Sequence, residues 1–278
     1  MSSQVTTAFS QQFSSTIMEL ADQQEARLAS GVRVEPLVGE KAFFDQIGNV
    51  EMNDRSSRHG DTVYSDTPHA RRMVTAVTSD RADLLDNADK VQMLTDPTNA
   101  YTKKFANAWA KRKDDHIINA AFASANTGKD GTTSVAFTAG NIIAIDFGGA
   151  SIGLTIAKLV EAKRILDVGE VDEEDRHIAV GSKQIADLLQ QTQYISHDFN
   201  TLHPLMSGQV VTYLGFTFHR SERLLVSAGT DHRRCPVWQR EGLLLAMAQD
   251  MVSRVDEMPN KRYSTQVYIE GTAGSTRM

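Results

Sequence analysis

The sequence predicts an α+β fold organised around one long helix. Residues 98–125 contain no Gly or Pro and carry apolar side chains at helical spacing, which predicts a rod of about 40 Å at ~1.5 Å per residue. Residues 48–78 are polar between two strand-like ends, and further β-forming runs come late, at 209–219 and 261–270. Because helices and strands do not alternate regularly, the pattern favours α+β over a parallel βαβ series.

The first 29 residues are rich in Gln, Ser and Ala, and their apolar side chains lie three or four positions apart. Phe9 and Phe13 begin this series, which predicts an amphipathic N-terminal arm. We expect both phenylalanines to anchor the arm on a neighbouring subunit. Residues 31–44 are predicted to be extended, because the residue before Pro36 is disfavoured in a helix.

Residues 48–78 are predicted to form a two-stranded arm with a polar tip. The end at Met73–Thr78 is rich in β-forming residues, whereas the middle is rich in Asn, Asp, Arg, Ser, His and Gly and cannot build a core. We therefore expect the arm to lie on an adjacent subunit, where arginine–carboxylate pairs give register and specificity. The charged residues are Arg55, Arg58, Arg71 and Arg72, balanced by Glu51, Asp54, Asp61 and Asp66.

A short helix is predicted at 82–94, before the long helix. Asp96 is a suitable N-cap for the long helix, and Pro97 suits its first position. Five consecutive charges interrupt the apolar stripe of the rod. A helix buried on all sides could not carry them unpaired, so we expect them to face solvent or a groove between subunits. They are Lys111, Arg112, Lys113, Asp114 and Asp115.

The second half of the chain shows shorter elements. The sequence predicts a turn-rich loop at 126–139, an amphipathic helix at 153–168, a buried strand at 178–181, a helix capped by Ser182 and a helix at 240–255. The strands at 209–219 and 261–270 complete the prediction.

Composition narrows the possible functions. Apolar residues make up 41% and charged residues 23% of the chain, which is the balance of an ordinary globular protein. No apolar run reaches 18 residues, and the N-terminus lacks the pattern of a secretory signal. Cys235 is the only cysteine, so an internal disulfide is impossible and a small buried side chain is expected. The net charge of −6 argues against sequence-independent DNA binding.

One short motif matches an enzyme signature. Residues 149–153 read G-x-S-x-G, the nucleophile elbow of serine hydrolases, with Ser151 as the nucleophile. The upstream sequence predicts an arm and a rod, however, instead of the parallel βα units that this motif requires. The alternative is a glycine turn in which Ser151 caps the following helix. Asp and His residues that could complete a triad do follow: Asp187, Asp198, His203 and His232.

Other possible sites are weaker. The acidic run at 170–175 lacks the alternating ligands and the turn glycine of a calcium loop, so a solvated turn is expected. His232 and Cys235 lack the spacing of a zinc site. We therefore predict no catalytic residue, no metal ligand and no cofactor.

The segment DTPHARRMVTAVTSDRADLLDNADKVQMLTDPTNAYTKKFANAWAKRKDDHIINAAF resembles the major capsid proteins of tailed bacteriophages. The later segments GLTIAKLVEAKRILD and CPVWQREGLLLAMAQDMVSRVDEMPNKRYSTQVYIEGTAGSTRM are also similar to that family, so the resemblance extends from about Phe9 to Met278. It implies the Hong Kong 97-type fold, with the following parts: an N-terminal arm (1–47), an extended E-loop (48–80), a peripheral domain with a spine helix (81–150), an axial domain (151–249) and a return to the peripheral domain (250–278).

The resemblance implies a protein that assembles with itself into hexameric and pentameric capsomers of an icosahedral shell around double-stranded DNA. The charged block of the rod would then face a groove between subunits or between capsomers. The founding member of the fold cross-links subunits through a lysine of the E-loop, but residues 48–78 contain no lysine. Non-covalent stabilisation, or a decoration protein, is therefore expected.

About 45 residues precede the arm, which favours a separate scaffolding protein over a built-in scaffold segment. A portal is a further expected partner, whereas sequence-specific nucleic acid and membranes are not. The expected location is the virion, after assembly in the host cytoplasm. A bacterial nanocompartment shell, which shares the fold, is the alternative.

Overall fold

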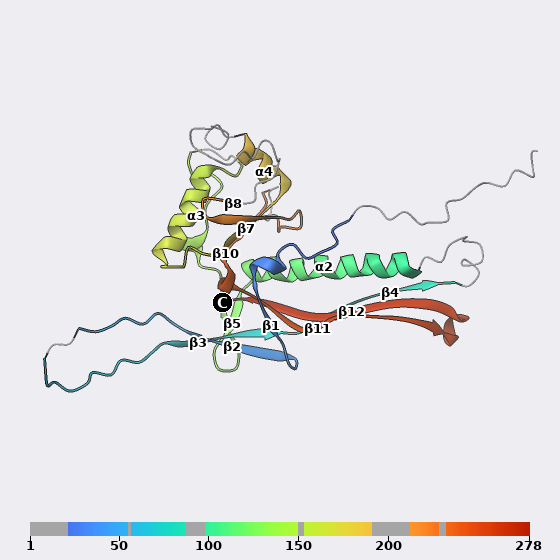
Figure 1. Cartoon of the computed structure of the whole chain (residues 1–278), viewed down its shortest axis with the longest axis horizontal. Helices are drawn as coiled ribbons and strands as arrows, with labels where there is room; N and C mark the ends of the chain where they lie inside the picture. The colour runs from blue at the N-terminus through green and yellow to red at the C-terminus, as the bar shows by residue number, and fades with distance from the viewer. Residues whose placement is uncertain (1–21, 55–56, 87–97, 150–152, 191–211, 228–231) are drawn as a thin grey trace, which may run out of the picture. The chain divides into compact units, whose positions relative to one another are not determined.

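The computed structural model describes residues 22–54, 57–86, 98–149, 153–190, 212–227 and 232–278. The chain divides into two compact units: unit 1 takes Met1–Glu25, Thr78–Lys111 and Gln249–Thr272, and unit 2 takes Ala26–Val77, Arg112–Ala248 and Ala273–Met278. Helix α2 (Thr98–Phe122) and strands β11 (Leu243–Met258) and β12 (Ser264–Arg277) contribute residues to both units (Figure 1). Residues 1–21 of the predicted N-terminal arm, with Phe9 and Phe13, lie outside the described residues.

Unit 1 combines the first part of α2 with β4 (Val77–Leu85) from Thr78 onward and the adjoining parts of β11 and β12. Its core consists of Leu85, Phe105, Val267 and Ile269, with Tyr101 packed against them. The indole Nε1 of Trp109 donates a hydrogen bond to Asp250 Oδ1 at 2.8 Å. Gly271 permits this packing, since a Cβ at that position would lie 2.6 Å from the indole ring, closer than real Cβ atoms approach a neighbour.

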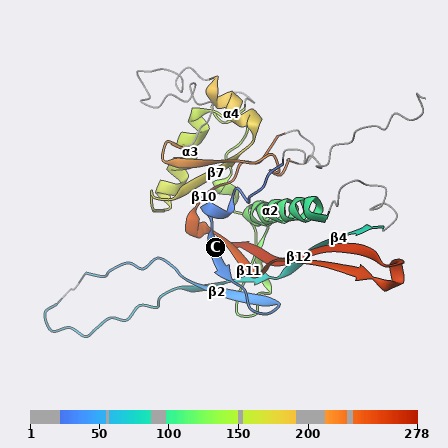
Figure 2. The same ribbon diagram turned by 45° about the vertical axis from the view of Figure 1, so that its right-hand side comes forward.

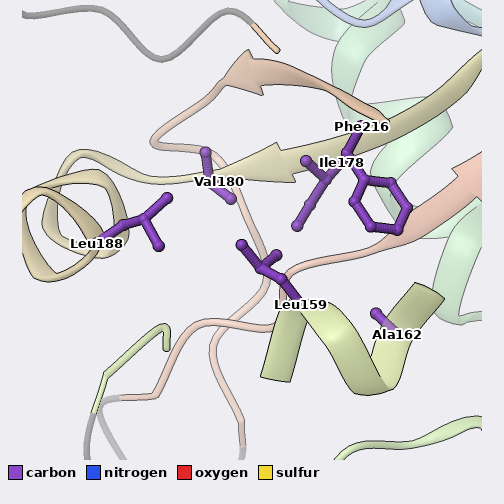
Figure 3. Packing of buried hydrophobic residues seen from close by; sticks show 6 residues of the cluster. All are labelled: Leu159, Ala162, Ile178, Val180, Leu188 and Phe216. Carbon is purple, nitrogen blue, oxygen red and sulfur yellow. The ribbon is translucent and has the colours of Figure 1, made fainter. Parts of the chain in front are cut away.

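The first sheet of unit 2 has the strand order β10-β7-β9-β8. All five residues of β7 (Arg176–Val180) are buried, and β7 pairs in parallel with β9 (Phe216–Arg220) and antiparallel with β10 (Val237–Gln239). Helices α3 (Ile156–Val168) and α4 (Ser182–Leu189) cover this sheet (Figure 2). Figure 3 shows the resulting core, formed by Leu159, Ala162, Ile178, Val180, Leu188 and Phe216.

The second sheet of unit 2 carries the arm. Strand β2 (Lys41–Ile47) pairs antiparallel with β3 (His69–Thr75), and the sheet continues through β5 (Ala125–Thr127) and β6 (Thr133–Val135). Strand β1 (Arg33–Pro36) lies parallel to the start of β11. Leu37, Val74, Leu244 and Ala246 form the core of this region.

Several predicted elements are confirmed. Helix α2 begins at Thr98 and ends three residues before the predicted Ala125, and α3, β7 and β12 overlap the predicted segments. The strand at the end of the arm is also present, as β3 and the start of β4. The capping residues predicted for α2, Asp96 and Pro97, lie outside the described residues.

The helix predicted at 240–255 is wrong, because Leu243–Met258 forms the strand β11. Leu243 to Ala246 are all buried in a strand that pairs with β1 on one side and lies next to β12 on the other. A strand covered on both faces shows a continuous apolar run instead of alternation. Leu, Ala and Met have high intrinsic helix propensity, which explains the wrong prediction. Tertiary packing overrides that propensity here.

Three other expectations need correction. Within 82–94 the described residues Ala82–Leu85 belong to β4, so no helix starts there. The segment 209–219 is not one strand: β8 (Thr212–Tyr213) and β9 flank Leu214 and Gly215, both at positive φ, as in a two-residue hairpin turn. Thr155, not Ser151, caps α3, because its hydroxyl accepts a hydrogen bond from Lys158 N.

Candidate subunit interface

The loop between β2 and β3, residues 48–68, is here called the arm loop. A hydrogen bond of 2.8 Å from Gly48 N to Pro68 O closes its base. Beyond this bond the described residues belong to no strand, and Met52 and Tyr64 are 99% and 91% exposed. Val50 and Val63 are exposed as well. Figure 1 shows the arm loop as a long excursion from the β2–β3 hairpin.

The sequence prediction for the arm named only charged residues and missed these apolar ones. A signal was present, since Val50 and Met52 alternate with Glu51, and Val63 and Tyr64 lie between Asp61 and Asp66. Neighbouring large apolar side chains that are exposed in one chain are typical of interaction surfaces, so the arm loop is a candidate interface.

The arginines of the arm differ in their contacts. Arg71 forms a two-pronged pair with Asp45 on β2, with Nε–Oδ1 at 2.6 Å and Nη2–Oδ2 at 3.3 Å. This hydrogen-bonded pair lowers the pKa of Asp45 and raises that of Arg71. The Arg71 guanidinium also lies 5.5 Å from the ring centre of Phe43. Arg71 is thus engaged within its own hairpin, and its role on a neighbouring subunit stays a prediction.

Of the other predicted arm arginines, the structure describes Arg58 and Arg72. Arg72 is half-buried on β3, and its Nε is buried with no hydrogen-bond partner among the described residues. Arg58 is exposed, and Arg55 lies outside the described residues. The intermolecular role of Arg58 and Arg72 therefore stays a prediction.

The charged block of α2 is not a uniformly solvated face. Asp114 is completely buried and accepts hydrogen bonds from Arg27 N at 3.1 Å and from Leu28 N at 3.0 Å. The prediction that this block faces a groove is therefore wrong for Asp114. A buried carboxylate is tolerated here because both oxygens bind backbone N–H groups.

Two further residues of the block form ion pairs within the chain. Asp115 binds Arg223 through both oxygens, at 2.6 and 2.5 Å. Lys111 pairs with Asp22, which lowers the pKa of that aspartate. Arg112 remains exposed and Lys113 is half-buried, so the predicted groove contact stays open for these two residues.

Residues 27–31 are held by several parts of unit 2, in an arrangement that sequence periodicity does not reveal. Besides the bonds to Asp114, Trp238 Nε1 donates to Gly31 O at 2.7 Å. His219 Nε2 lies 3.1 Å from His177 Nδ1, and a Cβ on Gly31 would lie 2.9 Å from His219 Nε2. Burial lowers the pKa of both histidines, and for His177 the charge of His219 adds to the effect.

The structure places some of the residue types that could carry chemistry. The described residues contain no cluster of three His, Cys, Asp or Glu side chains that could hold a metal ion. Burial raises the pKa of the Cys235 thiol to about 12, which disfavours the reactive thiolate. Of the possible triad, Ser151, Asp198 and His203 lie outside the described residues. No described helix is long and apolar enough to span a membrane.

Comparison with known structures shows the fold. The capsid of cyanophage P-SCSP1u matches with a TM-score of 0.72 and 15% identity, covering 99% of this chain and 91% of that chain. The capsid asymmetric unit of cyanophage Pam1 matches with a TM-score of 0.72 and 14% identity, covering 98% and 93%. A structure of Mycobacterium phage Che8 matches with a TM-score of 0.69 and 15% identity, covering 96% and 93%. The shared architecture is consistent with the Hong Kong 97-type fold that the sequence resemblance implied.

Sequence comparison shows the family. A search among curated proteins found no match. A family model described as "Phage capsid protein" matches residues 5–278, nearly the whole chain. The chain therefore belongs to the phage capsid protein family, and its role is that of a structural protein of the phage head.

Proposed function

We propose that the chain is the major capsid protein of a tailed phage and assembles into the icosahedral shell around its double-stranded DNA. The arm loop carries this proposal: a single chain leaves Met52 and Tyr64 almost fully exposed, and contacts with further copies would cover them. Repeated contacts of this kind close into rings and shells when the rotation between copies permits it.

The parts of the fold receive roles by analogy with the family. Residues 48–80 act as the E-loop, and α2 acts as the spine helix of a peripheral domain at 81–150. Residues 151–249 form the axial domain at the centre of hexamers and pentamers, and residues 250–278 return to the peripheral domain. The N-terminal arm, residues 1–47, uses Phe9 and Phe13 to bind a neighbour.

The proposed partners are further copies of the chain, a scaffolding protein, a portal and a decoration protein. The net charge of −6 supports a shell whose wall does not bind packed DNA tightly, because phosphate neutralisation is what drives non-specific binding. We assign no catalysis to the chain, and place it in the virion after assembly in the host cytoplasm.

Electron microscopy with light scattering tests the proposal. The full chain is expressed alone and together with its neighbouring genes, and closed shells or capsomers are expected in at least one condition.

The double substitution Arg71→Glu with Arg72→Glu is expected to leave the subunit folded but to block assembly. A monodisperse monomer under all conditions would contradict the capsid role, and ester hydrolysis by Ser151 would then be assayed with Ser151→Ala as the control.

A further inference from the structure

Arg71 and Arg72 are adjacent on β3 but lie in different environments. Successive side chains of a strand point to opposite faces of the sheet. Arg71 meets Asp45 of the neighbouring strand, whereas Arg72 stands opposite Thr127 of β5 and has a buried Nε without a partner among the described residues. A buried donor without an acceptor costs free energy, so an acceptor that reached the Arg72 guanidinium would be stabilising.

Arg277, at the end of β12, lies beside the same β5–β6 hairpin. Its guanidinium donates to Ala123 O and Val135 O, both at 3.2 Å, and lies 4.9 Å from the ring centre of Phe137. These acceptors are neutral carbonyls. Within the described residues, neither Arg277 nor Arg72 has a carboxylate as an ion-pair partner.

Arg72 and Arg277 both border the β5–β6 hairpin, since Arg72 stands opposite Thr127 of β5 and Arg277 donates to Val135 O of β6. Burial, and after it the positive charge of Arg72, holds the pKa of Arg277 below its usual range. Val135 and Phe137, which lie beside Arg277, are still 37% and 36% exposed. We call Arg72, Arg277, Val135 and Phe137 the arginine patch. A ligand that fits it needs a carboxylate next to an apolar side chain.

Among the acidic segments that could supply the carboxylate, the acidic turn at 170–175 and the arm loop belong to the same unit as the patch. The acidic turn at 170–175 already uses several of its side chains: Glu173 pairs with Lys163, Asp175 pairs with Arg240, and Glu170 accepts from Asn49. The carboxylates of the arm loop are exposed and form no ion pair with another described residue; they are Glu51, Asp54, Asp61 and Asp66.

The arm loop also carries the most exposed apolar side chains of the described residues, Met52 and Tyr64, next to these acids. We propose that the arginine patch receives the arm loop of a second copy of the chain, with a loop carboxylate bound between Arg72 and Arg277. This inference rests on the proposed shell function and identifies the surface that the arm loop contacts.

Disulfide trapping in assembled particles tests the pairing directly. In a background in which Cys235 is replaced by Ala, Arg72→Cys is combined in one chain with Cys at Glu51, Asp54, Asp61 or Asp66, one at a time. Mild oxidation is expected to produce disulfide-linked dimers and longer ladders on non-reducing gels for at least one combination. Arg71→Cys with the same loop cysteines is the matched control, because Arg71 faces the other side of β3.

A second measurement does not depend on cysteines. Arg72→Gln is expected to reduce assembly, measured by light scattering as the chain concentration required, by about tenfold, as for loss of one partly desolvated ion pair. Arg71→Gln should change that concentration less, since Asp45 belongs to the same hairpin.

The outcomes separate this inference from the proposed function. Wild-type shells with no cross-link at any loop position and no effect of Arg72→Gln would overturn the pairing and leave the capsid role intact. Cross-links only within single chains would show that the loop folds onto its own patch, which also overturns it. Capture of Arg72 by a scaffolding or decoration protein would overturn it as well. Failure of the wild-type chain to form shells would contradict the proposed function itself, and the pairing with it.

Discussion

The sheet around β7 and the arm loop differ in the exposure of their apolar side chains. Ile178, Val180 and Phe216 have 1% or less of their surface exposed, whereas Met52 and Tyr64 keep more than nine-tenths of theirs. The first region completes its contacts within one chain and contributes to the stability of the subunit. The second region gains little from its own chain, so its apolar residues contribute to assembly. Stability and assembly should therefore respond to different substitutions.

The largest loss of subunit stability is expected in the β7 sheet. Phe216 is fully buried in the core shown in Figure 3. Phe216→Ala should lower the free energy of unfolding by about 3–5 kcal/mol, because it removes buried apolar surface and leaves a cavity. Urea denaturation of the unassembled chain measures this change. A loss below about 1 kcal/mol would show that the core repacks or is less closely packed than the structure indicates.

A smaller loss of subunit stability is expected at Asp114. This buried carboxylate of α2 is hydrogen-bonded to the backbone of residues 27 and 28. Asp114→Ala leaves the N–H groups of Arg27 and Leu28 without their acceptors and should cost about 2–3 kcal/mol. Asp114→Asn retains one acceptor oxygen and should cost less. Equal stability of the wild type and both variants in urea denaturation would contradict the assigned hydrogen bonds.

Acid should weaken the same region. The pKa values of His177 and His219 are lowered by burial in the folded chain, so the unfolded chain takes up protons at higher pH than the folded chain does. Stability is thus lost as the pH falls below about 6.5 and continues to fall until the folded pKa values are reached. The slope from each histidine cannot exceed about 1.4 kcal/mol per pH unit.

Substitution separates these histidines from other titrating groups. His177→Gln with His219→Gln should flatten the curve of unfolding free energy between about pH 7 and about pH 5. His116 should leave a residual slope, since its pKa is also lowered, first by burial and then by Arg112. Identical slopes in the wild type and the double variant would refute the effect.

The smallest effect on the subunit is expected in the arm loop. Met52→Ser with Tyr64→Ser should change the unfolding free energy of the unassembled chain by less than about 0.5 kcal/mol, as usual for exposed sites. Assembly, followed by light scattering, should nevertheless be strongly reduced. Ser substitution at Val168, an exposed apolar residue of α3, is the matched control and should assemble normally. Normal assembly of the loop variant would contradict the assignment of assembly to the arm loop and of subunit stability to the β7 sheet.

Local patterns in the sequence were sufficient for some elements. The spacing of apolar residues predicted α2 and α3, because both helices bury one face and expose the other. The same reasoning failed for β11, whose Leu243–Ala246 run is buried in the middle of a sheet and therefore shows no alternation. Family resemblance, and not periodicity, indicated the capsid function.

The candidate interface was only partly accessible to sequence reasoning. The composition of residues 48–78 indicated a polar arm, and the described residues 48–68 are exposed, but they form no strand, so the first strand predicted for the arm is absent. Charge alone could not show that Arg71 binds Asp45, whereas Arg72 and Arg277 both border the β5–β6 hairpin. Nor could five consecutive charges on α2 show that Asp114 is buried. These distinctions depend on residues far away in the chain.

The sequence by itself determined the α+β class, the long helix, the polar arm and the family, because these depend on local spacing, composition and the order of motifs. Only the tertiary structure decided which charges are satisfied within one chain. Asp114 finds the N–H groups of residues 86 and 87 positions away, and Arg277 finds carbonyls more than 140 positions away. The energy of a charged or polar group depends on the partners and burial that folding gives it, and no local pattern encodes them.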